Sequence, residues 1–153
     1  MVIYITIYII MNLGFFSCLL MMKRNNVYYE QIDDLSGLSK NHPMLSLSLL
    51  IILFSLAGIP PLAGFFAKFY IFKSVIEQSM YFLAIVGLLA TVVAAFYYLR
   101  IIKIMYFDKE KESYDKDHSL SLKFSLTFST LIILLYFIFP SQLVDAVSNI
   151  NII

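Results

Sequence analysis

The apolar residues of this sequence are gathered into four long blocks that polar connections separate. The blocks run over residues 2–22, 44–78, 80–105 and 120–139. Each is long enough to cross a hydrocarbon core about 30 Å thick as a helix that rises about 1.5 Å per residue. The pattern predicts an all-α fold, a polytopic membrane bundle of four transmembrane helices within residues 1–140. A short C-terminal tail follows over residues 141–153.

The second block contains a segment that should break a helix. Pro60 and Pro61 remove two backbone N–H donors and clash with the preceding turn, and Gly58 can adopt the dihedral angles that an interruption requires. We therefore expect the second span to be discontinuous between Gly58 and Pro61. Interrupted backbone at membrane depth survives only where it faces protein or a water-filled cavity, and such breaks mark ion and substrate sites in transporters.

The composition agrees with a membrane location and excludes several function classes. Hydrophobic residues make up 61% of the chain and charged residues 14%, whereas soluble domains average about half and about a quarter. The formal net charge of +1 argues against a nucleic-acid partner, because such proteins concentrate Lys and Arg on one face. Cys18 is the only cysteine, so it forms no disulfide within the chain and is expected to be a small buried hydrophobe.

The distribution of basic residues predicts an orientation. Four spans place loops 23–43 and 106–123 on one side of the membrane, and this side collects most of the Lys and Arg residues, whereas Lys73 stands alone on the other. The positive-inside rule assigns the first side to the cytoplasm or the mitochondrial matrix. Lys23 and Arg24 follow the first block where a signal peptide would have a small-residue cleavage site, so we expect that block to be a retained helix.

Lys68 is the residue most suggestive of chemistry. It follows Pro61 by seven positions and lies close to the membrane midplane if the second half-helix continues to about Gln78. Insertion scales put the cost of a lysine there at about 2.5–3.5 kcal/mol, so such a residue normally faces a bundle interior or water. A lysine held there could gain and release a proton. In the alternative interpretation, the half-helix ends near Phe72 and Lys68 snorkels to the interface.

The other polar and small residues have structural interpretations. Lys73 and Glu77 are expected at the interface, and Asn12 and Gly14 could join helices. The third block carries small residues at helical spacing that would let another helix approach closely, namely Gly87, Ala90, Thr91, Ala94 and Ala95. Neither His42 nor His118 has a second ligand at metal-binding spacing, so no metal site is expected.

Two stretches of the sequence resemble a known family. The first runs from Ser55 to Tyr70 and includes the break and Lys68, and the second runs from Phe96 to Phe107. Together they closely resemble the C-terminal part of the antiporter-like membrane subunits of respiratory complex I, NADH dehydrogenase subunit 2 in particular. The resemblance covers nearly the whole chain and fades after about Lys123.

The resemblance implies a role for each part of the chain. Family members have about fourteen helices with two inverted repeats, and the matching region is the last four. Lys68 then matches the central proton-relaying lysine of the second half-channel, and Gly58, Pro60 and Pro61 match its helix break. The implied location is the mitochondrial inner membrane, with the bacterial plasma membrane as the alternative. Loops 23–43 and 106–123 would face the matrix or cytoplasm.

The resemblance also implies partners, because roughly the first ten helices of the family are absent from this sequence. We expect a split gene product whose missing helices come from a separate chain, beside other complex I membrane subunits and the lipid bilayer. No cofactor is expected in this chain, since flavin and iron–sulfur clusters would belong to other subunits of the NADH:ubiquinone oxidoreductase. The leading hypothesis is a non-redox, proton-translocating subunit. The alternatives are a fragment of a cation/proton antiporter and a purely structural membrane subunit.

Overall fold

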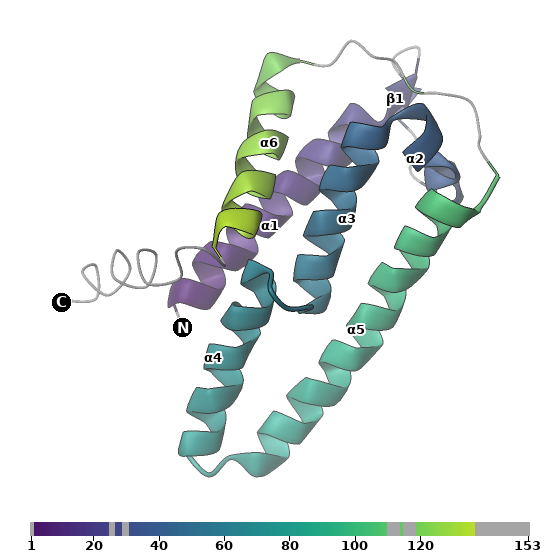
Figure 1. Cartoon of the computed structure of the whole chain (residues 1–153). Helices are drawn as coiled ribbons and strands as arrows, with labels where there is room; N and C mark the ends of the chain where they lie inside the picture. The colour runs from purple at the N-terminus through teal and green to yellow at the C-terminus, as the bar shows by residue number, and fades with distance from the viewer. Residues whose placement is uncertain (1, 25–26, 29–30, 110–113, 115–118, 137–153) are drawn as a thin grey trace.

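The computed structural model describes residues 2–24, 27–28, 31–109, 114 and 119–136, and the predicted tail lies outside them (Figure 1). The described residues are helical except for turns and one two-residue ladder, which confirms the all-α prediction. The long helices are α1 (Val2–Met21), α3 (Pro43–Ala57), α4 (Ala63–Glu77), α5 (Tyr81–Phe107) and α6 (Leu120–Leu135). Between α1 and α3 lie β1 (Lys23–Arg24), β2 (Val27–Tyr28), the 3-10 helix η1 (Ile32–Leu35) and α2 (Leu38–Asn41).

Helices α1, α3 and α6 pack against one another, while α5 packs against α3 and α4 packs against α1. Helices α4 and α5 form an antiparallel hairpin whose turn lies beyond the other helices (Figure 1). The core is centred on α3, where Leu49, Ile52 and Leu53 are fully buried. Gly14 of α1 allows a close approach, because a Cβ there would lie 2.8 Å from the Cβ of Ser129 on α6. A small residue at a helix crossing is how membrane helices gain close packing.

The second block divides into α3 and α4, and the interruption predicted between Gly58 and Pro61 lies between them. Helix α3 ends at Ala57 because Gly58 takes a left-handed conformation, with φ +86°. The Gly58 N–H donates to the carbonyl of Ser55 and the Ile59 N–H to that of Phe54. These two bonds form a Schellman motif, in which glycine is favoured because it lacks a Cβ.

The helix ends depart slightly from the four predicted spans. Helix α5 continues to Phe107, two residues beyond the predicted end, and the described part of α6 ends at Leu135 rather than residue 139. By length and composition, α1 and α5 are each able to cross a membrane, whereas α3 and α6 are shorter apolar helices. The count of four spans therefore remains a prediction.

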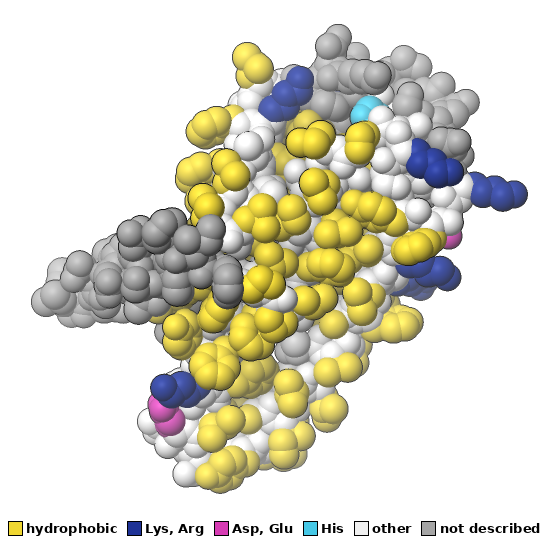
Figure 2. All heavy atoms as spheres, in the orientation of Figure 1, with side chains coloured by type: hydrophobic (Ala, Val, Ile, Leu, Met, Phe, Trp, Pro, Cys, Tyr) yellow, Lys and Arg dark blue, Asp and Glu magenta, His cyan; other side chains and the backbone are white. Residues whose placement is uncertain are grey.

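Residues 31–42, the end of α5 and the start of α6 lie at one end of the molecule, and the short turn between α4 and α5 lies at the other (Figure 1). Figure 2 shows hydrophobic side chains over much of the visible face, with charged side chains toward its periphery. Helix α5 contributes many of the exposed apolar residues, among them Phe82, Leu89 and Val92. Its surface is suited to contact with lipid or with other membrane helices.

Candidate functional site

Lys68 of α4 bends back toward the break and contacts the end of α3. Its Nζ atom donates to the carbonyl oxygen of Leu56 at 2.8 Å and to that of Ala57 at 3.3 Å. The side chain is half-buried. The amine therefore lies at the helix break rather than at the far end of α4, where the snorkelling interpretation would place it.

Lys68 completes the hydrogen bonding of the α3 terminus. A helix leaves its last four carbonyls without partners inside the helix. The Schellman bonds satisfy Phe54 and Ser55, and Lys68 satisfies Leu56 and Ala57. These carbonyls also carry the negative end of the helix dipole, so a cation at this position is electrostatically favoured.

The start of α4 is held against the last turn of α3 by a second contact. The Gly64 N–H donates to the hydroxyl oxygen of Ser55 at 2.9 Å, and the Ser55 hydroxyl donates to the sulfur of Met11 at 3.0 Å. A Cβ on Gly64 would lie 1.9 Å from the Ser55 carbonyl oxygen. Only glycine permits this approach, which sets the distance between Lys68 and the carbonyls that it binds.

Gly58 contributes space as well as conformation. A Cβ at Gly58 would lie 3.2 Å from Cδ of Lys68 and 3.4 Å from its Nζ. The lysine side chain therefore passes directly over the glycine on its way to the α3 carbonyls. Gly58 thus ends the helix and makes room for the amine.

Lys68 also lines an open cavity of about 240 Å³ bordered by α1, α4, α5 and Leu56 of α3. The polar residues around it are Tyr4 and Tyr8 of α1 and Thr91 and Tyr98 of α5. Because water occupies about 30 Å³ per molecule in the liquid, the cavity has room for several waters. The arrangement places an amine, three phenols and one threonine hydroxyl around a space that water can fill.

Within the described part of the chain, no carboxylate lines this cavity. The described residues likewise contain no group of three or more His, Cys, Asp or Glu side chains that could hold a metal ion. No metal site was expected at either histidine. His118 lies outside the described residues. His42 accepts a hydrogen bond from the Tyr114 N–H at 3.1 Å. The amine and the hydroxyl groups that do line this cavity can form hydrogen bonds and exchange protons with water.

The other predicted residues fall in several places. Lys73 and Glu77 form an exposed pair 3.9 Å apart on α4, away from the site. The Asn12 amide donates to the Tyr8 carbonyl of its own helix at 2.8 Å and therefore does not join helices as predicted. Cys18 is fully buried in the core, as expected for a small hydrophobe.

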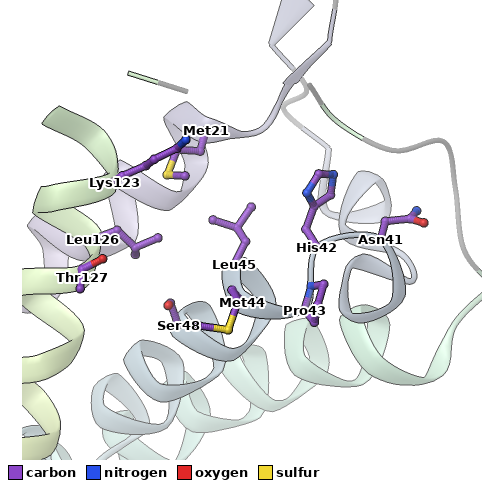
Figure 3. Close-up of a pocket in the computed structure, with 10 residues that line it drawn as sticks. All are labelled: Met21, Asn41, His42, Pro43, Met44, Leu45, Ser48, Lys123, Leu126 and Thr127. Atoms are coloured by element: carbon purple, nitrogen blue, oxygen red, sulfur yellow. The ribbon is translucent and has the colours of Figure 1, made fainter. Parts of the chain in front are cut away.

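A larger hollow of about 500 Å³ lies at the opposite end of α3, among α1, α3 and α6. Figure 3 shows Lys123 on the α6 side and His42 on the α3 side, with Leu45 between them. Most of its lining is apolar or uncharged. His42 and Lys123 lie on opposite sides of this hollow (Figure 3), whereas polar groups surround the Lys68 amine, so we place the candidate site at Lys68.

The tyrosines and Ser55 were not predicted as site residues from the sequence. The sequence favours a packing surface at Thr91 and its small neighbours, but Ala90, Thr91 and Ala94 line the cavity and leave it open beside Lys68. A run of small residues in one span can mark such a space when a lysine lies in the neighbouring span. Tyr4 and Tyr8 carry no comparable signal, since tyrosine near a helix end usually marks the membrane interface.

The chain matches the model of a protein family described as NADH:quinone oxidoreductase/Mrp antiporter, transmembrane, over residues 1–94. It belongs to this family. It is 80% identical over 152 residues to the NADH-quinone oxidoreductase subunit N of Pelagibacter ubique, covering 99% of this chain and 32% of the relative. It is 49% identical to the subunit N of Parvibaculum lavamentivorans, covering 94% of this chain and 30% of the relative.

A solved structure has the same fold. A chain in the structure of respiratory complex I from Thermus thermophilus with bound aureothin superposes with a TM-score of 0.76, at 23% identity, over 90% of this chain and 31% of that chain. The family match and the subunit N relatives confirm the resemblance to antiporter-like membrane subunits of complex I and support a membrane location. The chain spans about a third of the length of these relatives.

Proposed function

We propose that this chain forms the C-terminal half-channel of a proton-translocating, antiporter-like subunit of an NADH-quinone oxidoreductase. Lys68 is the proton relay, and the break formed by Gly58, Pro60 and Pro61 supplies its carbonyl acceptors. The observation that carries the proposal is the pair of bonds from the Lys68 amine to Leu56 and Ala57, at 2.8 and 3.3 Å, beside a cavity that water can fill.

The energies favour a polar environment around the Lys68 amine. A lysine at the bilayer centre costs about 2.5–3.5 kcal/mol, and a cation at a partly buried helix C-terminus regains up to about 2 kcal/mol. The remaining cost favours water or a further polar group beside the amine. A change of charge elsewhere in the assembly would then act on Lys68 through these surroundings and shift it between its protonated and neutral forms.

The surroundings of the chain are part of the proposal. The relatives are bacterial, which favours the bacterial plasma membrane over the mitochondrial inner membrane that the sequence suggested. The loops that follow α1 and α5 face the cytoplasm by their basic residues. This chain spans about a third of the relatives' length. The part corresponding to the other two thirds packs against it, either on the same polypeptide or on a separate one. Flavin and iron–sulfur clusters belong to other subunits, so this chain performs no redox chemistry.

The direct test is Lys68→Met in the assembled oxidoreductase, reconstituted in sealed vesicles. NADH oxidation and acidification are measured together, so that protons moved per NADH can be calculated. Lys73→Met is the matched control, because this lysine is exposed on the same helix and five residues away. We expect the ratio to fall in Lys68→Met and to remain unchanged in Lys73→Met. An unchanged ratio in Lys68→Met would exclude the relay.

The family description also includes Mrp antiporters, which favours one alternative function. In that case the same lysine would exchange protons for another cation within a smaller assembly. The alternative predicts that the chain copurifies without flavin or iron–sulfur subunits and that transport depends on a cation gradient. Copurification with NADH-oxidising subunits would support the oxidoreductase.

A further inference from the structure

The geometry of the Lys68 amine restricts the direction from which it can exchange a proton. A lysine ammonium has three N–H donors, arranged tetrahedrally with the bond to Cε. Two of these donors point at the carbonyls of Leu56 and Ala57. A single position on the nitrogen is left, and it is the one that carries a hydrogen in the ammonium and a lone pair in the neutral amine.

The neutral amine can keep both carbonyl bonds, because it still has two N–H groups. Proton uptake then forms the third N–H bond at the vacant position, and release breaks that same bond, without any movement of the side chain away from α3. Lys68 borders the cavity between α1, α4 and α5. Gly58 lies against the Lys68 side chain, and Leu56 at the end of α3 both accepts from the amine and lines the cavity.

We propose that Lys68 exchanges its proton only on the cavity side, with water that the hydroxyls of Tyr8, Thr91 and Tyr98 hold in place. This inference rests on the proposed function and deepens it. The Thr91 hydroxyl donates to the Gly87 carbonyl at 2.9 Å, so its oxygen lone pairs remain available to a water molecule. Tyr8 comes from α1 and Tyr98 from α5, and both line the cavity.

The tyrosines act as positioning residues for this proton transfer. A phenol can donate to and accept from water at once, so phenols contributed by α1 and α5 can order a short chain of waters that ends at the amine. Each transfer moves one proton from water to nitrogen or back, and no other bond changes. The alanines at 90 and 94 line the same cavity and leave it open.

The test compares hydroxyl-deleted variants in the assembled oxidoreductase in sealed vesicles. Tyr8→Phe, Tyr98→Phe and the double variant keep the rings and remove the hydroxyls. Tyr97→Phe is the control, because Tyr97 is 57% exposed and does not line the cavity. We expect the rate of proton translocation in the double variant to fall about tenfold. Positioned proton-transfer groups raise a rate by about 10²–10⁴-fold, and we expect water in the cavity to take over part of the lost contribution. The control should match the wild type.

A second readout separates proton delivery from damage to the fold. When delivery limits turnover, the ratio of coupled rates in H₂O and D₂O rises, whereas loss of active protein leaves that ratio unchanged. We expect a raised ratio in the double variant alone. If the phenylalanine variants fail to assemble, Ala90→Leu tests the same claim by filling the cavity from an exposed position on α5, and it should also reduce translocation and raise the ratio.

The two proposals fail in distinguishable ways. Normal translocation and a normal isotope ratio in both the double variant and Ala90→Leu, with Lys68→Met inactive, would overturn the cavity-side exchange and leave the relay intact. Normal translocation in Lys68→Met would overturn the relay itself. Loss in the tyrosine variants with an unchanged isotope ratio would reduce these residues to packing and would also overturn the inference.

Discussion

Replacement of Gly64 by alanine tests how closely α4 must approach α3. In an exposed helix, glycine to alanine stabilises by about 1 kcal/mol, so propensity alone predicts a gain. At Gly64, however, the new Cβ would lie 1.9 Å from the Ser55 carbonyl oxygen, whereas real Cβ contacts are essentially never under 3.0 Å. The difference requires the two helices to separate by at least 1.1 Å. Overpacking of this kind costs about 1–3 kcal/mol. The contacted atom is a backbone carbonyl oxygen, which cannot rotate away from the new methyl group as a flexible side chain could.

The same separation acts on the Lys68 bonds. They measure 2.8 and 3.3 Å now, and a donor and acceptor more than about 3.5 Å apart no longer form a hydrogen bond. We therefore expect Gly64→Ala to lose at least the longer bond, to lower the thermal-inactivation midpoint of the assembled complex and to reduce protons moved per NADH.

Gly87→Ala provides the matched control for this prediction. Its added Cβ would meet only the ring tip of Phe72, at 3.1 Å, and an aromatic ring can turn aside. Both variants add one methyl group to a helix, so they differ only in what that methyl contacts. Wild-type midpoint and wild-type translocation in Gly64→Ala would refute the argument from close approach.

Three further predictions concern the same region. Gly58→Ala should lower the thermal-inactivation midpoint, because the left-handed conformation costs an alanine about 1–2 kcal/mol. The new Cβ would also crowd Cδ of Lys68 at 3.2 Å. A wild-type midpoint and a wild-type ratio of protons moved per NADH would contradict this prediction. Ser55→Ala leaves the Gly64 N–H without its acceptor and should cost about 1–3 kcal/mol, seen as faster exchange of that amide; unchanged exchange would count against the bond. Lys73→Met should leave midpoint and translocation unchanged, because its ion pair is exposed; a clear loss would show that the exposed face of α4 matters.

The break and the lysine could be predicted because their chemistry is local. Two prolines after a glycine end a helix wherever they occur, and a lysine in an apolar block is costly whatever surrounds it. The acceptors of Lys68 could not be predicted, since Leu56 and Ala57 precede it by twelve and eleven residues across the turn. Their position depends on how far α4 folds back onto α3, which the Gly64 contact decides.

The tyrosine cavity depends on contacts between distant parts of the chain. Tyr8 and Tyr98 come from the first and third apolar blocks, and a sequence shows neither which faces of those helices meet nor whether space remains between them. Asn12 failed as a prediction for a related reason. Its amide found an acceptor one turn away in its own helix, and a local bond of this kind competes with any bond between helices.

Proton relay by Lys68 requires that its amine binds the α3 carbonyls at the helix break and contacts water in the cavity. The most direct measurement is an experimental structure of the assembled oxidoreductase in lipid, at a resolution that shows ordered water. We predict that Nζ contacts the carbonyl oxygens of both Leu56 and Ala57 and that water lies between the amine and the hydroxyls of Tyr8 and Tyr98. An amine directed toward the lipid headgroups, or a dry and tightly packed space beside it, would contradict the account.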